Sequence, residues 1–151
     1  MATEDFSGAY ASIKEILQSA RSQVFRAVNS AMVKAYWEIG SVIVEEEQKG
    51  KSKARYGERL LAELSMRLTA DYGRGFDESN LRYIRLFYLK FRIRDAVRHE
   101  LTWTHYRLLL RQENPYARSF YLNECISSRW STRELDRQMN SLLYERLALS
   151  K

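Results

Sequence analysis

Apolar side chains recur every three or four residues from Ile13 to Ile43, and no proline interrupts them. This spacing places them along one side of an α-helix. At 1.5 Å per residue the helix would span about 45 Å, provided that Gly40 does not break it. A small domain needs less than that length, so we expect the helix to project or to pair. The apolar positions are Ile13, Ile16, Leu17, Ala20, Val24, Ala27, Val28, Ala31, Met32, Ala35, Ile39, Val42 and Ile43.

Residues that break helices are scarce in the rest of the chain as well. The 151 residues include one proline, Pro115, and six glycines, and no stretch alternates apolar and polar residues as a strand would. With 45% apolar residues the chain can bury a core of its own. We therefore predict one all-α domain over residues 1–151, more than about 60% helical. It consists of a long N-terminal helix within 1–50 and a multi-helix, helix-turn-helix-like core over 55–151.

Capping and turn residues set the expected helix boundaries. Gly73 suits the end of one helix, and the side chain of Asp77 can cap the start of the next. Ser131 and Glu134 have the spacing of a capping box, in which each side chain bonds a backbone amide. The expected elements are a loop over 47–54 and helices over 56–72, 78–94, from Thr102 or Thr104 through 111, 114–129 and from Ser131 onward.

The predicted helix over 78–94 has an apolar face and a basic face. With the helix before it and the turn over 73–76, it matches a helix-turn-helix, whose second helix enters the major groove of DNA. Asparagine pairs with adenine, and arginine pairs with guanine or with phosphate. The predicted nucleic-acid-binding residues are Arg74, Ser79, Asn80, Arg82, Tyr83, Arg85 and Arg92; the apolar face consists of Leu81, Ile84, Tyr88 and Phe91.

The positive charge is concentrated in the middle of the chain. Residues 1–50 carry five basic and seven acidic groups, residues 51–111 carry fourteen and seven, and the last forty carry six and five. A basic middle between nearly neutral ends is typical of a phosphate-binding face, although a solvated surface has the same composition. Duplex DNA is the predicted partner.

Residues typical of catalysis, cofactor binding or membrane insertion are not in evidence. His99 and His105 are six residues apart and lack a partner at a catalytic spacing, and no nucleotide-binding or zinc-protease motif occurs. Glu47-Gln48-Lys49 has the letters of a nuclease acid-x-Lys pair but follows a helix rather than a strand. We therefore predict no catalytic residue, cofactor, metal or small-molecule substrate.

The same features predict a cytoplasmic location. The chain has a single cysteine, Cys125, an acidic N-terminus, and no apolar run of the roughly 20 residues that a membrane span needs.

Long ordered motifs give the chain a family resemblance. It resembles the N-terminal domain of YhcG-type proteins over nearly its whole length, in the strings YWEIG (36–40), YGERLLAELSMRLTADYGRGFDESNLRYIRLFY (56–88), LTWTHYRLLLR (101–111), RSFYLNECISSRWSTRELDRQM (118–139) and LLYERLALSK (142–151). The resemblance implies a helical, helix-turn-helix-like DNA-binding domain that a PD-(D/E)XK nuclease domain usually follows. It assigns no catalytic residue to this chain, because the nuclease part has no counterpart here.

Two other functions remain open from the sequence. The long N-terminal helix could pair with a second copy or with a partner protein, making the chain an interaction module with an incidental basic face. Its tyrosines and arginines would also suit RNA. A DNA face could instead be built around Arg107, Arg111 and Arg133.

Overall fold

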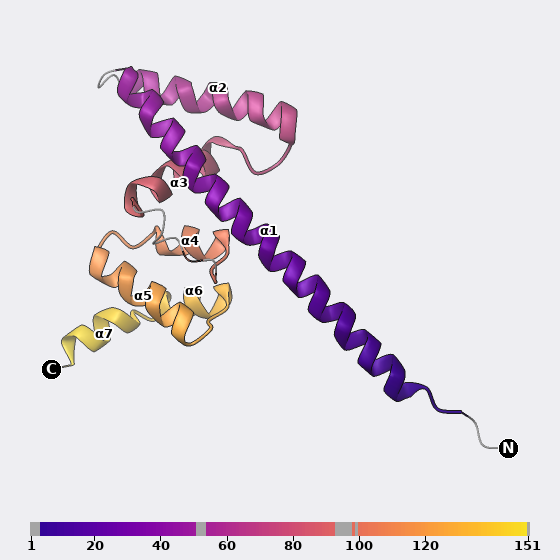
Figure 1. Cartoon of the computed structure of the whole chain (residues 1–151). Coiled ribbons are helices and arrows are strands. Elements are labelled where there is room, and N and C mark those ends of the chain that lie inside the picture. The colour runs from indigo at the N-terminus through magenta and orange to yellow at the C-terminus, as the bar shows by residue number, and fades with distance from the viewer. Residues whose placement is uncertain (1–3, 51–53, 93–97, 99, 151) are drawn as a thin grey trace.

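The computed structural model describes residues 4–50, 54–92, 98 and 100–150, and this part of the chain contains seven helices and no strand (Figure 1). The all-α prediction is therefore confirmed. The helices are α1 (Ser7–Lys49), α2 (Ala54–Tyr72), α3 (Glu78–Lys90), α4 (Trp103–Leu109), α5 (Pro115–Ser127), α6 (Thr132–Asn140) and α7 (Leu143–Leu149).

Helix α1 is longer than the apolar pattern predicts. It has 43 residues and continues through Gly40, so at 1.5 Å per residue it spans about 65 Å. Its N-terminal half extends away from the other helices, which pack along its C-terminal half (Figure 1). Among the described residues no helix, α1 included, is both long enough and apolar enough to cross a membrane.

Gly40 lies at a close approach between α1 and α3. A methyl group placed on Gly40 would lie 2.5 Å from the carbonyl oxygen of Ile84 and 2.8 Å from Cβ of Tyr88. The glycine is buried inside the helix, so it marks a close helix contact and not a break.

Two clusters of buried side chains form the core. The smaller lies between α1, α2 and α3, and the larger joins α3 to the C-terminal helices. Tyr36 and Trp103 pack against both clusters, with ring centroids 4.9 Å apart. The buried members of the smaller cluster are Ile43, Leu61, Leu81 and Ile84; those of the larger are Val33, Phe87, Leu101, Tyr106, Leu108, Leu109, Leu110, Ala117, Tyr121, Cys125, Leu135 and Met139.

Several predicted helix ends were wrong. The loop expected from residue 47 begins only at Gly50, because α1 continues to Lys49. Helix α3 stops at Lys90 and not at residue 94, because Phe91 leaves helical geometry and its carbonyl accepts a hydrogen bond from the Trp37 indole. The helix expected through 111 ends at Leu109, and the one expected to end near 129 ends at Ser127.

The C-terminal segment also differs from the single helix that was expected. It divides into α6 and α7 at Leu142, whose φ of 58° is left-handed. Of the two threonines proposed as caps, Thr102 caps α4. At Ser131 the hydroxyl accepts the Glu134 amide as predicted, but the Glu134 carboxylate turns to Arg137 and Gln138.

Candidate nucleic-acid interface

Helix α3 is fixed at its N-terminus by Asn80. This side chain is only 8% exposed. Its amide donates to the Gly75 carbonyl at 2.6 Å, and its oxygen accepts from the Trp103 indole at 3.0 Å. The Asn80 backbone amide donates to Asp77, the helix cap. Asn80 thus joins α3 to the preceding turn and to α4, and it does not belong to the exposed face on which the sequence prediction placed it.

The side chain of Arg85 is held by an ion pair with α1. Its Nε donates to both carboxylate oxygens of Glu47, at 2.6 and 2.8 Å. The Arg85 and Glu47 side chains are 38% and 18% exposed. The pair links α3 to the last turns of α1, so Arg85 and Arg82, three residues apart, have different surroundings. Glu47, the acid of the Glu47-Gln48-Lys49 string, is engaged in this pair.

The exposed face of α3 carries Ser79, Arg82 and Tyr83. Arg82 is 59% exposed and pairs with Glu78 at 3.3 Å, one turn back along the helix. These side chains line a groove of about 520 Å³ between α3 and the residues after α4; its lining is Ser79, Arg82, Tyr83, Leu86, Lys90, Leu110, Arg111 and Glu113.

Two arginines from α4 and its C-terminal end extend this face. The guanidinium carbon of Arg107 lies 4.5 Å from the centroid of the Tyr83 ring. Arg111 lines the groove beside Arg82, is 59% exposed, and pairs with Asp136 at 3.6 Å. A guanidinium stacked by its face keeps its N–H donors at the edge, where they can bind phosphate. Arg82, Arg107 and Arg111 thus gather around Tyr83.

A second groove continues the basic surface toward α5. It has a volume of about 440 Å³ and shares Lys90 with the first groove. Arg92 and Arg118 also line it; Arg92 lies over the Tyr88 ring at 5.1 Å, and Arg118 donates to the Gln112 carbonyl at 2.7 Å. We call the two grooves together the basic track.

The turn before α3 carries the remaining predicted residue. Arg74 is exposed between Gly73 and Gly75, whose φ angles of 82° and 107° explain why glycine occupies both positions. Of the predicted residues, Ser79, Arg82, Tyr83 and Arg92 line the basic track, whereas Asn80 and Arg85 hold α3 in place. Lys90, Arg111 and Arg118 also line the basic track but were not among the residues predicted around α3. Arg111 was instead part of the alternative DNA face that the sequence suggested, together with Arg107 and Arg133.

His105 has a structural position between α4 and the residues that follow α5. It is 7% exposed. The Thr102 amide donates to its Nδ1 at 3.1 Å, so its proton is on Nε2, which lies 2.9 Å from the Trp130 carbonyl oxygen. Burial lowers the pKa of His105 below 6.5, against the opposing effect of the bond to Trp130. His99 lies outside the described residues. Within the described ranges, histidine, cysteine and acidic side chains form no group of three that could hold a metal.

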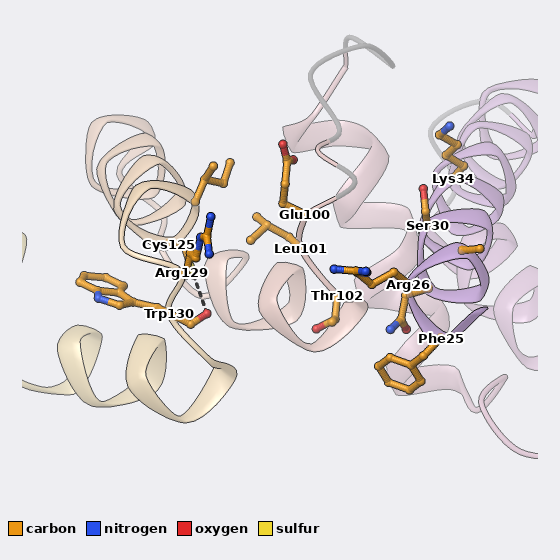
Figure 2. Close-up of a pocket in the computed structure, with 13 residues that line it drawn as sticks. Phe25, Arg26, Ser30, Lys34, Glu100, Leu101, Thr102, Cys125, Arg129 and Trp130 are labelled. Atoms are coloured by element: carbon orange, nitrogen blue, oxygen red, sulfur yellow. Dashed lines mark hydrogen bonds between the residues drawn. The ribbon is translucent and has the colours of Figure 1, made fainter. Parts of the chain in front are cut away.

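A separate hollow lies where α1 leaves the body of the domain. It has a volume of about 850 Å³. Figure 2 shows Arg26 extending from α1 toward Thr102, with Arg129 on the other wall and Glu100 between them. The hollow carries charges of both signs, and none of the predicted nucleic-acid-binding residues lines it.

Comparison with known proteins gives two matches. The family model of the DUF1016 N-terminal domain matches residues 12–146. A relative described as "Putative nuclease YhcG", from Escherichia coli (strain K12), is 36% identical over an alignment that covers 98% of this chain and 48% of the relative. The chain thus spans about half the length of that relative. No solved structure matches the chain.

Proposed function

The chain belongs to the DUF1016 N-terminal domain family, and from this premise we propose that it is a duplex-DNA-binding module that positions a nuclease. The relative's description names a nuclease, and more than half of the relative's length lies outside the region that matches this chain. In the proposal, that other part carries out cleavage and this chain supplies none of the catalytic residues.

One observation carries the proposal: basic side chains from two helices converge on a single face. Arg82 and Lys90 come from α3, Arg107 from α4, and Arg111 follows α4, all around or beside Tyr83. Positive side chains grouped on one face attract the phosphates of DNA and release the counterions condensed on them. Glu113 lines the first groove, and one further acid pairs with each of Arg82 and Arg111, so the four basic side chains exceed the three acidic ones by one charge.

Within this face the residues have different proposed tasks. Arg82, Lys90, Arg107 and Arg111 contact phosphates and set the position of the duplex. Ser79, near the N-terminus of α3, and Arg74, in the turn before it, lie where a helix-turn-helix reaches the DNA. Asn80 and Arg85 act indirectly, because the contact of Asn80 with Trp103 holds α3 to α4 and the contact of Arg85 with Glu47 holds α3 to α1. We further propose a cytoplasmic location, where the thiol of Cys125 stays reduced.

The test compares two arginines in matched settings. Arg82 pairs with Glu78 and Arg67 pairs with Glu63, each with a glutamate one turn back on an exposed helix surface. Substituting either arginine with glutamate changes the charge equally and removes one surface pair, a loss of about 0.3–0.5 kcal/mol. Only Arg82 lies in the basic track. In fluorescence anisotropy, Arg82→Glu should weaken binding to a labelled duplex at least about tenfold, and Arg67→Glu should change it by less than about twofold.

The same titrations separate the alternatives. Single-stranded DNA and RNA are measured beside the duplex at two salt concentrations. Tighter binding to RNA than to duplex DNA would mean that the basic track recognises RNA. An equal loss of duplex affinity in Arg82→Glu and Arg67→Glu would show that only the overall charge of the protein matters. Absence of binding to any nucleic acid would favour the interaction-module alternative.

A further inference from the structure

The free half of α1 exposes a regular apolar seam. From Phe6 to Ala31 the positions alternate steps of four and three residues, and each of the large side chains on it is more than half exposed. Charged Lys34 and Glu38 then take the next positions of the pattern. A seven-residue repeat of this kind is the pattern of helices that supercoil around one another. The seam residues are Phe6, Tyr10, Ile13, Leu17, Ala20, Val24, Ala27 and Ala31.

The seam faces away from the body of the domain, except that Ala27 also lines the edge of the hollow between α1 and the body. Ala31, on the seam, is exposed, whereas Val33 is buried in the core with only 2% of its surface exposed. The two residues are two positions apart, so their side chains point about 200° apart around the helix. Another helix can therefore lie along the seam without meeting the helices that pack on the opposite side of α1. The exposed area is also sufficient. Seven large apolar side chains on the seam and its edges, each leaving roughly 100 Å² or more uncovered, approach the approximately 800 Å² per partner of a stable interface. They are Phe6, Tyr10, Ile13, Ile16, Leu17, Val24 and Val28.

The order of large and small residues along the seam indicates which helix binds to it. When the seam is paired with its own sequence in reverse, Leu17 meets Ala20, Tyr10 meets Ala27, Phe6 meets Ala31 and Ile13 meets Val24. In three of these four layers a large side chain faces an alanine, and two β-branched residues form the fourth. A parallel pair would match each residue with itself, so that Phe6 and Tyr10 would face identical aromatic rings while Ala20, Ala27 and Ala31 would face alanines. Helix pairs pack best when large and small residues face each other.

We infer that the free half of α1 binds the same segment of a second copy of this chain, antiparallel, with the two-fold axis between residues 18 and 19. In this register position n of one copy faces position 37 − n of the other, as the pairs above show. The two bodies, whose buried contacts with α1 begin at Val33, then lie at opposite ends of the paired helices. Each copy keeps its basic track outside the interface, so a dimer would present two such faces.

The flanks of the seam predict how the dimer responds to salt. Lys14 of one copy lies next to Arg21 of the other, so like charges face each other on both sides of the axis. Added salt screens such exposed repulsion. Self-association should therefore strengthen with salt, whereas binding to DNA weakens with it. The dimer does not depend on the DNA-binding proposal. Because salt should strengthen dimerisation and weaken DNA binding, measurements at two salt concentrations show which of the two proposals is wrong.

The first test measures association by sedimentation of the whole chain without nucleic acid. The unmodified chain should form a dimer. Leu17→Glu puts a charge into two central layers of the dimer, and because Leu17 is 55% exposed in the single chain, it should leave that chain folded. The dimer dissociation constant should rise at least about 100-fold. The control Gln18→Glu makes the same charge change on the neighbouring residue, which is outside the seam, and should dimerise normally. A chain that stays monomeric, or a Leu17→Glu variant that dimerises like the control, would overturn the inference.

The second test determines direction with the seam intact. Ser12 and Ser19 are exposed, seven residues apart and on the same side of α1. Spin labels attached at Ser12→Cys or at Ser19→Cys report the distance between the two copies, and Cys125, 2% exposed, stays unlabelled. In the antiparallel register the two labels at position 19 are offset by about 2 Å along the axis, and those at position 12 by about 20 Å. The Ser12→Cys distance should therefore be clearly longer. Equal distances at the two positions would mean a parallel dimer and would refute the register.

Discussion

Replacing Gly40 with alanine should destabilise the domain, although the same change normally favours a helix. In the middle of a helix, glycine to alanine gains about 1 kcal/mol. Here the added methyl group would lie 2.5 Å from the Ile84 carbonyl oxygen and 2.8 Å from Cβ of Tyr88. Neither atom is the flexible end of a side chain, so α1 and α3 must separate, and overpacking of this kind costs about 1–3 kcal/mol. The short distances favour the upper end of that range, giving a net loss of about 2 kcal/mol.

Gly8 provides the control within the same helix. An alanine there would meet nothing within 4 Å, so Gly8→Ala should leave stability unchanged or raise it by up to about 1 kcal/mol. The assay is equilibrium unfolding in urea, followed by far-ultraviolet circular dichroism. A Gly40→Ala protein that is as stable as the unmodified chain would show that α1 and α3 do not pack as closely as described.

Two further predictions concern buried polar contacts. Because burial lowers the pKa of His105 below 6.5, the unfolded chain binds a proton at this residue at a higher pH than the folded chain does, so the free energy of unfolding should fall as the pH drops below 6.5. Part of this fall should disappear in His105→Gln; an unchanged pH profile in urea titrations of that variant would refute the role. Arg85→Gln should cost about 1–2 kcal/mol by leaving Glu47 without its main partner, while changing duplex affinity by less than about twofold. A large loss of duplex affinity in an Arg85→Gln protein that remains folded would mean that Arg85 contacts DNA directly.

Local patterns predicted most of the helices correctly. The spacing of apolar residues predicted the long N-terminal helix, and the caps expected at Asp77, Thr102 and Ser131 each form in the structure. Each of these features depends on residues within one or two turns of one another, so a single sequence contains the information. The division of the last helix was not predictable in this way, because Leu142 takes a left-handed conformation that glycine would normally signal.

The candidate interface was only partly predictable, because it depends on contacts between distant residues. The helical spacing of α3 grouped Arg82 with Arg85, yet Arg85 pairs with Glu47, 38 positions earlier in the chain. Asn80 has the chemistry to read a base, but it is buried, and its side-chain oxygen accepts a hydrogen bond from Trp103, 23 positions later in the chain. The position of Arg107 over Tyr83 likewise results from the packing of α4 beside α3. Charge counting located the basic region, and only the tertiary structure separates the residues that line the basic track from those that hold it in place.

The salt dependence of duplex binding tests the DNA-binding proposal most directly. The logarithm of affinity should fall linearly with the logarithm of salt concentration, by about 0.9 for each phosphate neutralised. An Arg82→Glu, Arg107→Glu double variant loses two proposed phosphate contacts, so its slope should be flatter by about two units, whereas Arg67→Glu should keep the original slope. If the double variant is folded and binds duplex DNA with the affinity and salt slope of the unmodified chain, the face around Tyr83 is not the DNA-binding surface of this protein.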